Sequence, residues 1–199
     1  FFFFLIALLL NEVRSKGIRR LYQWVMFLPF FMGWSLVAMV LYGLIDYEVG
    51  TFNMLLKNLG LERIALMNKA KLWPWLLTLI HVWKGTGSGC IIYLAVLVGI
   101  NPELYEAASI DGAGRLQRMW YISLPSLFPT MVILTLLAIG RIFFGNWGMI
   151  YALVGNNALL YPTTDVIDTY ILRALQSNVN FGMSAAVGLS QSLLGFILV

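Results

Sequence analysis

One long apolar stretch, residues 73–100, contains polar side chains that could in principle do chemistry, namely His81, Lys84 and Ser88. His81 could act as a base and Ser88 as a nucleophile, the two parts of a serine hydrolase centre. On a helix their offset of seven residues separates them by about 10 Å, at roughly 1.5 Å per residue, which exceeds hydrogen-bond reach. An intramembrane serine hydrolase would therefore need a sharp break in this helix, and it is a remote alternative.

Ionisable groups in apolar segments are costly, and they usually face a cavity or a polar partner. His81 and Lys84 therefore fit two interpretations: they line a translocation pathway, or neighbouring helices satisfy them while the lysine reaches the interface. Arg141, near the outer end of the next span, is open to the same alternatives. If such a pathway passes here, Trp147 and Tyr151 would offer aromatic faces to the transported molecule.

Several other features argue against a nucleotide site, a disulfide and a metal site in this chain. In residues 84–89 the lysine precedes the glycines, unlike the order in a phosphate-binding loop. Gly85 and Gly89 instead form a small-xxx-small pair that predicts close helix packing. The single cysteine, Cys90, excludes an internal disulfide and a thiolate metal cluster, and no acidic or histidine set has metal-ligand spacing. We expect no catalytic residue, no metal and no cofactor bound by this chain.

Residues 101–121 carry the most specific pattern. Asn101 is a good N-cap, Pro102 suits the first helical position, and Glu103 and Glu106 favour the positive end of a helix dipole. These residues predict a short helix that begins at residue 102.

The remainder of this loop predicts a two-helix projection. Leu104, Ala107, Ala108 and Asp111 have helical spacing, so small residues form a face that another protein could approach closely. Gly112 can stop this helix by adopting a left-handed conformation. We expect Asp111 to cap a second short helix that leads into the next span, which Pro125 enters in its first turn; this second helix contains Arg115, Arg118 and Trp120.

The elements that position these residues must lie in a membrane. Of the 199 residues, 60% are hydrophobic and 11% charged, against roughly 45–50% and 25% in soluble domains, and the mean hydropathy is +0.83. A net charge of +4, scattered along the chain, gives no basic surface for nucleic acid. The fold class is therefore an all-α integral membrane protein.

The apolar runs predict a polytopic helical bundle in one domain, residues 1–199. A partial span covers residues 1–10, and full spans cover about 21–45, 73–100, 124–144 and 179–199. The basic segment 11–20 is cytoplasmic by the positive-inside rule. Residues 46–72 and 144–180 then face outward, whereas 101–121 face inward. We expect both ends of the sequence to be cut through a helix.

The inward loop resembles a known family. The spaced pattern of Glu106-Ala107-Ala108, Asp111-Gly112-Ala113, Ile122 and Leu124-Pro125 is similar to the EAA loop of binding-protein-dependent ABC importer permeases. Residues 8–11, 147–154 and 165–173 look like the sugar permeases, particularly the polysaccharide group. Where many of these have a Thr-Gly-Gly-Gly-Pro turn, this chain has residues 154–157 as Val-Gly-Asn-Asn, which weakens any transfer of a particular substrate.

The resemblance implies the fold of a type I ABC importer permease in a bacterial inner membrane. It implies that the loop docks on cytoplasmic ATPase subunits, which bind ATP and Mg²⁺, through Glu106, Ala107, Ala108, Asp111, Gly112 and Ala113. It also implies a second permease subunit, most readily in a heterodimer, and an external binding protein that delivers an oligosaccharide or polysaccharide-derived sugar. The alternative is a secondary transporter or channel, with Lys84 or Arg141 on the ion path and uptake that needs no ATP.

Overall fold

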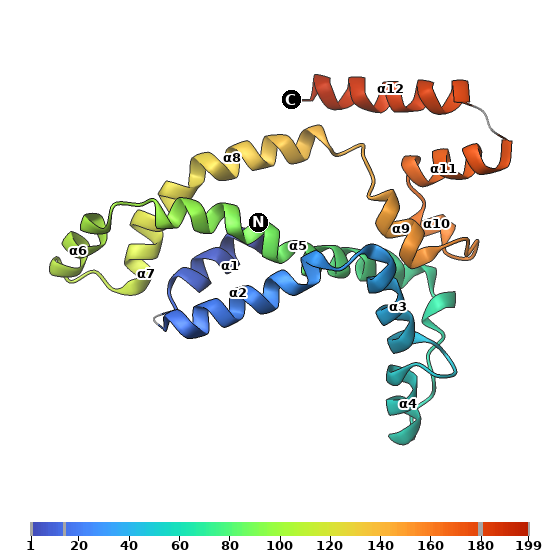
Figure 1. Ribbon diagram of the computed structural model, residues 1–199, viewed down its shortest axis with the longest axis horizontal. Coiled ribbons are helices and arrows are strands. Elements are labelled where there is room, and N and C mark those ends of the chain that lie inside the picture. Colours follow the sequence, from blue (N-terminus) through green and yellow to red (C-terminus); the bar gives the residue numbers. More distant parts are fainter. Residues whose placement is uncertain (1, 14, 179–180, 199) are drawn as a thin grey trace. The chain divides into compact units, whose positions relative to one another are not determined.

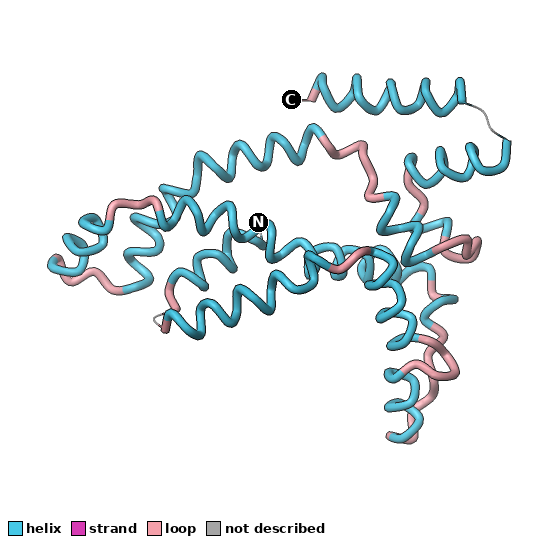
Figure 2. Tube along the Cα trace, in the orientation of Figure 1, coloured by secondary structure: helices cyan, strands magenta, loops and turns pink. Residues whose placement is uncertain are grey.

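The computed structural model describes residues 2–13, 15–178 and 181–198, and within these the chain is helical, without a strand (Figures 1 and 2). The longer helices are α1 (Phe2–Asn11), α2 (Lys16–Phe31), α3 (Trp34–Ile45), α4 (Thr51–Asn58), α5 (Trp73–Val98), α6 (Pro102–Ile110), α8 (Leu124–Gly140), α9 (Trp147–Val154), α11 (Ile167–Asn178) and α12 (Phe181–Ile197). Shorter pieces are the 3₁₀ turns η1 (Leu66–Asn68) and η2 (Ala70–Leu72), helix α7 (Arg115–Arg118), the π-helical turn η3 (Met119–Ser123) and helix α10 (Tyr161–Thr164).

The chain forms two compact units. Unit 1 contains Phe1–Phe31 and His81–Ala138, and unit 2 contains Met32–Ile80 and Ile139–Val199. Helix α5 therefore contributes its first part to unit 2 and its second part to unit 1.

Unit 1 is built around the glycines of α5. A Cβ atom at Gly87 would lie 2.5 Å from the carbonyl oxygen of Met26, so the backbones of α5 and α2 touch there. At Gly89 a Cβ would lie 2.4 Å from the ring of Phe3, which occupies this space from α1. The close packing predicted from the small-xxx-small pair is thus confirmed. The buried core beside these contacts comprises Ala7, Leu8, Leu10, Cys90, Tyr93, Leu94, Leu97 and Leu127.

Unit 2 has its own core and an ordered segment between α3 and α5. Helices α3, α5 and α9 bury apolar side chains against one another, and the hydroxyl of Tyr42 donates to the carbonyl of Leu153 at 2.9 Å. The fully buried Asn53 accepts from the amide of Ile64 at 2.8 Å and donates to the carbonyl of Asp46 at 3.0 Å. A single amide side chain therefore ties the start of the predicted outward loop to Ile64 within it.

Among the described residues, two helices are long and apolar enough to cross a membrane by themselves, Ala70–Val98 and Arg115–Gly140. The span expected at 21–45 is two helices: α2 contains Pro29 and ends at Phe31, and Gly33 then adopts an extended conformation as the N-cap of α3. Proline removes a backbone donor and so weakens the last turn before the break. The pair passes the same test only when taken together as a broken span.

The outer expected spans are shorter in the structure. Helices α1 and α12 are apolar but have only 10 and 17 residues. Positions 1, 179–180 and 199, where the first and last expected spans begin and end, lie outside the described residues. The span boundaries as a set remain a prediction.

The glycine contacts predict a graded response to added methyl groups. Gly87→Ala places a Cβ against the backbone of α2, and overpacking of this kind costs about 2 kcal/mol, so we expect a clear loss of thermal stability in detergent. Gly85→Ala is the matched control on the same helix, because its Cβ would meet only the end of the Phe3 ring, at 3.3 Å. Equal stability of the two variants would contradict the backbone contact.

Candidate functional site

Helix α6 begins as the sequence predicts. The Asn101 side chain accepts from the amide of Glu103 at 3.1 Å, and Pro102 occupies the first helical position. The amide nitrogen Nδ2 of Asn101 donates to the Glu103 carboxylate at 3.0 Å. The start of the helix is therefore closed by its own side chains.

The end of α6 is a Schellman turn. Gly112 has a φ of +79°, a conformation that favours glycine, and its amide donates to the carbonyl of Ser109 at 3.2 Å. The amide of Ala113 donates to the carbonyl of Ala108 at 2.9 Å. The predicted stop at Gly112 is confirmed, and Ala108 and Ala113 are half-buried because the turn brings them together.

The prediction that Asp111 caps the next helix is wrong. Asp111 is the C-cap of α6, whereas Gly114 is the N-cap of α7 and donates its amide to Oε1 of Gln117 at 2.7 Å. Pro125 lies in the first turn of α8, as predicted, although the helical backbone continues without interruption from Arg115 to Gly140. The wide π-helical turn η3 comes directly before α8. It relieves the clash that the ring of Pro125 would otherwise make with the preceding backbone.

Helix α6 is tied to the long helix that follows it. The Tyr105 hydroxyl lies 2.8 Å from the hydroxyl of the buried Ser123. Arg118 donates to the hydroxyl of Ser109 at 2.7 Å, and Ser109 donates to the carbonyl of Tyr105 at 2.7 Å. The sequence analysis missed this chain of contacts, although tyrosine, serine and arginine around the motif are the side chains that could make it. We call residues 101–114 the coupling knob, after the role that the family resemblance implies for its motif residues.

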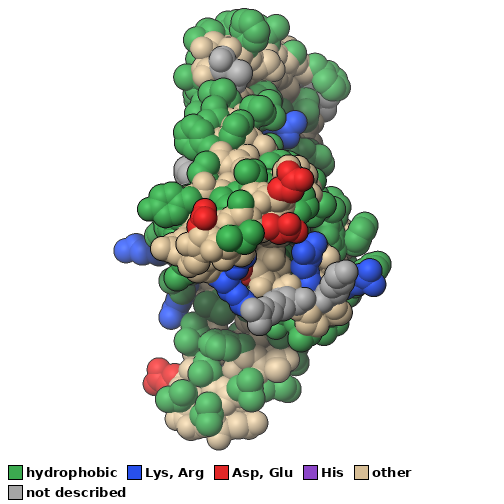
Figure 3. All heavy atoms as spheres, turned by 90° about the vertical axis from the view of Figure 1, so that its left-hand side faces the viewer, with side chains coloured by type: hydrophobic (Ala, Val, Ile, Leu, Met, Phe, Trp, Pro, Cys, Tyr) green, Lys and Arg blue, Asp and Glu red, His purple; other side chains and the backbone are tan. Residues whose placement is uncertain are grey.

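The knob exposes both charged and apolar side chains. The exposed residues of the motif are Glu106, Ala107, Asp111 and Gly112. Within the described residues, neither Glu106 nor Asp111 forms an ion pair. Ile110 is 87% exposed, and it was not singled out from the sequence. Acidic and basic side chains gather on the face that carries α6 and α7, with hydrophobic side chains around them (Figure 3).

The five predicted pathway residues are divided between the two units. In unit 1 the Lys84 ammonium donates to the carbonyl of Phe30 at 3.0 Å and lies 5.6 Å from the centre of that ring, while His81 is exposed. In unit 2 Arg141 is exposed in the turn after α8, and Trp147 and Tyr151 are one helical turn apart on α9.

The serine hydrolase geometry is absent. Helix α5 is continuous from Trp73 to Val98, so the separation of His81 from Ser88 is that of an unbroken helix. The Ser88 hydroxyl donates to the carbonyl of Gly85 at 3.2 Å. Among the described residues, no group of three histidine, cysteine or acidic side chains could hold a metal ion.

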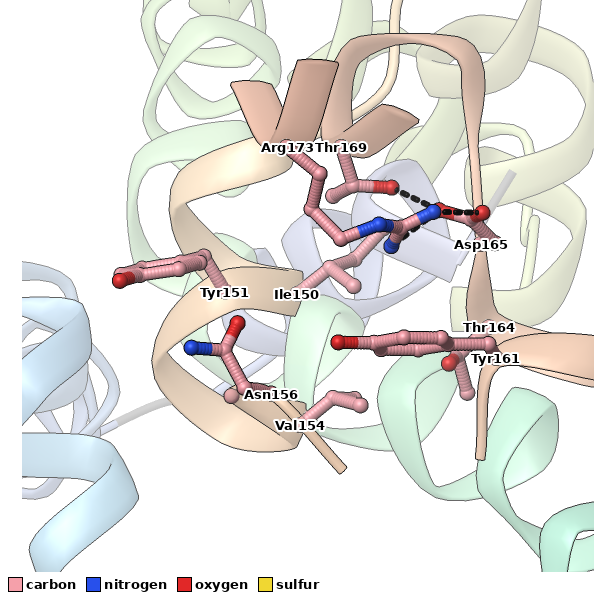
Figure 4. A pocket seen from close by; sticks show the side chains of 10 residues that line it. Ile150, Tyr151, Val154, Asn156, Tyr161, Thr164, Asp165, Thr169 and Arg173 are labelled. Carbon is pink, nitrogen blue, oxygen red and sulfur yellow. Dashed lines mark hydrogen bonds and ion pairs between the residues drawn. The ribbon is translucent and has the colours of Figure 1, made fainter. Parts of the chain in front are cut away.

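A charged cluster follows α9 in unit 2 (Figure 4). Arg173 forms an ion pair with Asp165 through both carboxylate oxygens and stacks over the ring of Tyr161, 4.2 Å from its centre. Thr169 donates to Asp165 at 2.6 Å. The Asp165 carboxylate is thus paired, whereas the Asp168 carboxylate accepts a hydrogen bond from the amide of Gly145.

The electrostatics of this cluster favour the charged pair. Partial burial raises the pKa of the Asp165 carboxyl, but the hydrogen bonds from Arg173 and Thr169, with the charge of Arg173, hold that pKa below its ordinary value. The same hydrogen bond to Asp165 raises the pKa of Arg173. The ion pair and the stacked tyrosine ring fasten α11 to the segment after α9, and the residues around them line a small pocket.

The helices long and apolar enough to span a membrane, with the exposed, capped loop, are the arrangement that the family resemblance predicts. Residues 4–199 match the family described as binding-protein-dependent transport system inner membrane component. This chain therefore belongs to that family, which confirms the resemblance noted in the loop and the all-α membrane fold.

Relatives support the assignment. Protein LplB of Bacillus subtilis (strain 168) is 35% identical over 195 residues, 98% of this chain and 61% of the relative. The polygalacturonan/rhamnogalacturonan transport system permease protein YteP of the same organism is 36% identical over 195 residues, 98% of this chain and 60% of the relative. The chain thus spans about three fifths of the length of these relatives.

A solved structure is also similar. A chain of a bacterial alginate ABC transporter, in complex with an alginate pentasaccharide-bound periplasmic protein, superposes with a TM-score of 0.89 at 32% identity. The match covers 98% of this chain and 67% of that one.

The charged cluster makes a prediction about pH. Asp165→Asn removes the ion pair, so we expect it to lower the free energy of unfolding by about 1 kcal/mol at pH 7. Because the pKa of Asp165 is lowered in the folded protein, its contribution is complete above the ordinary value of about 3.9 and disappears as the pH falls through the lower folded value. The difference between wild type and variant, measured by thermal unfolding in detergent, should therefore vanish in strong acid.

The matched control is Glu48→Gln, which removes the ion pair with Arg63. The Glu48 side chain is 73% exposed, so this variant should be close to wild type at every pH. A loss for Glu48→Gln as large as for Asp165→Asn, or a difference for Asp165→Asn that persists unchanged in acid, would contradict the assignment.

Proposed function

We propose that this chain forms the transmembrane part of a permease subunit in an ATP-driven importer, and that the coupling knob docks on a cytoplasmic ATPase subunit. The observation that carries the proposal is the knob itself. The residues of the family motif sit on an exposed helix that is closed at both ends and fastened to a helix long enough to span the membrane.

The motif residues divide into two roles. Ala108, Gly112 and Ala113 build the Schellman turn and so fix the shape of the tip. Glu106 and Asp111 offer exposed carboxylates, and Ala107 leaves room for close approach. We add Ile110, whose exposed side chain suits an apolar pocket in the ATPase.

The contacts behind the knob give a route for mechanical coupling. Closure of two ATPase subunits on ATP would move the knob, and the Tyr105–Ser123 and Arg118–Ser109 hydrogen bonds would pass this motion to the helix Arg115–Gly140. Alternating access then follows from rocking of the spans. ATP and Mg²⁺ would be bound by the partner subunits, and this chain would bind no cofactor.

The proposed cargo is an oligosaccharide or polysaccharide-derived sugar, delivered by an external binding protein to a pore shared with a second permease subunit in a bacterial inner membrane. Its support is the named activity of the relatives, which include a polygalacturonan/rhamnogalacturonan permease and an alginate transporter. Trp147 and Tyr151, which are 52% and 40% exposed, are the proposed aromatic contacts, with His81, Lys84 and Arg141 as further pathway candidates.

The proposal predicts which proteins accompany the full-length protein. Purification from its own membrane in mild detergent, followed by mass spectrometry of the subunits, should recover a nucleotide-binding ATPase and a second permease. Uptake of oligosaccharide should stop when ATP is depleted. Recovery of this protein alone, with uptake unaffected by ATP depletion, would instead favour the secondary transporter.

The knob makes a sharper prediction. Glu106→Lys reverses an exposed charge, and Gly112→Glu places a bulky acid on a backbone with positive φ, so each should reduce uptake at least tenfold and lower the amount of ATPase that copurifies, without loss of membrane insertion. Glu62→Lys, an equal charge change at an exposed site in the segment between α4 and α5, is the control for Glu106→Lys. Wild-type uptake in both knob variants would remove the coupling assignment.

A further inference from the structure

A groove in unit 1 runs between α2 and the second part of α5. It has a volume of about 890 Å³, and its walls are mainly apolar, with Trp24, Phe27 and Phe31 on α2 and Ile91 and Leu94 on α5. These positions recur at helical spacing, so each helix presents one continuous stripe to the groove. None of these residues belongs to the coupling knob or to the predicted pathway.

One end of the groove is strongly basic. Arg19 and Arg20 line it at the start of α2, and neither side chain has a hydrogen bond or an ion pair within the part of the chain that the structure describes. A guanidinium group matches the geometry of a phosphate and can bind it through two parallel hydrogen bonds. The groove therefore combines two free cations at one end with an apolar channel along the remainder.

The length of the groove matches one leaflet of a bilayer. From Arg20 to Phe31 the helix rises about 17 Å, at roughly 1.5 Å per residue, and half of the hydrocarbon core of a bilayer is about 15 Å thick. The basic segment 11–20 is the part of the chain that the positive-inside rule places in the cytoplasm. The basic end would then lie at the level of the inner headgroups.

We propose that this groove binds an anionic glycerophospholipid of the cytoplasmic leaflet. Arg19 and Arg20 hold its phosphate, one acyl chain follows Phe27 toward Phe31, and the exposed indole of Trp24 lies at the interface beside the glycerol region. The two unpaired cations select a headgroup with net negative charge over a zwitterionic one. The proposal depends on the membrane location of the chain, not on the identity of the transported cargo.

The test measures lipid retained by the assembled full-length protein. The complex is reconstituted in nanodiscs of phosphatidylcholine with one quarter phosphatidylglycerol, extracted again in mild detergent, and analysed by native mass spectrometry. We expect wild type to retain phosphatidylglycerol in clear excess over its share in the nanodisc. Arg19→Gln/Arg20→Gln should reduce this retention at least fivefold.

Two further variants separate charge from shape. Lys69→Gln/Lys71→Gln makes the same change in net charge at exposed sites in unit 2 and should retain lipid like wild type. Ala95→Phe fills the groove from an exposed position on its wall and leaves both arginines in place, so it should lose the lipid as well. Retention in proportion to the nanodisc composition, or equal retention in all variants, would overturn the proposal.

A photo-crosslinker identifies the occupant directly. Benzoylphenylalanine in place of Trp24, activated in native membranes, should form an adduct with a phospholipid. An adduct with another segment of the full-length protein or with a second subunit would show that protein covers the groove, and it would overturn the lipid assignment while leaving the importer proposal intact.

Discussion

At the end of a helix, backbone N–H and C=O groups lose their partners within the helix and must find others, because the interior of a bilayer offers none. In a chain this apolar, the long-range hydrogen bonds follow from that constraint. At several places a side chain distant in the sequence donates a hydrogen bond to such a carbonyl. The Lys84 ammonium takes the carbonyl of Phe30 near the end of α2, and the buried Gln191 donates to the carbonyl of Phe143 in the turn after α8, at 2.8 Å. Asn53 does the same for the loop after α3. Each of these side chains therefore fastens a helix end or a loop within its own unit.

In the coupling knob the same constraint is met locally, and this affects how a partner could recognise it. The Asn101 cap and the Schellman turn at Gly112 already satisfy the backbone at both ends of α6. A docking protein would gain little from the remaining backbone groups, so recognition must come from side chains, namely the exposed carboxylate of Glu106 and the apolar side chain of Ile110. Glycine and alanine at the other motif positions maintain the turn and keep the surface close to the helix axis.

Interactions between near neighbours could be predicted from the sequence, and those between distant residues could not. The cap at Asn101, the stop at Gly112 and the close packing of the glycines on α5 depend on residue type and short spacing, and all three are confirmed. The Tyr105–Ser123 contact depends on how the chain returns on itself, which no local pattern specifies. The break at Gly33 was missed for a related reason: the apolar run continues across it, so hydropathy alone could not show that the helix stops.

The same reasoning ranks the candidate pathway residues. A pathway role for Lys84 would require its ammonium to leave the Phe30 carbonyl, and a backbone carbonyl without a partner is costly in the interior of a bilayer. Capping a helix end therefore accounts for this lysine without a cargo. Trp147 and Tyr151 carry no such structural duty: both are partly exposed on one face of α9, and the described interactions include no side-chain hydrogen bond of either. Aromatic faces that can bind a sugar without releasing a backbone group are better suited to a site that must fill and empty in every transport cycle.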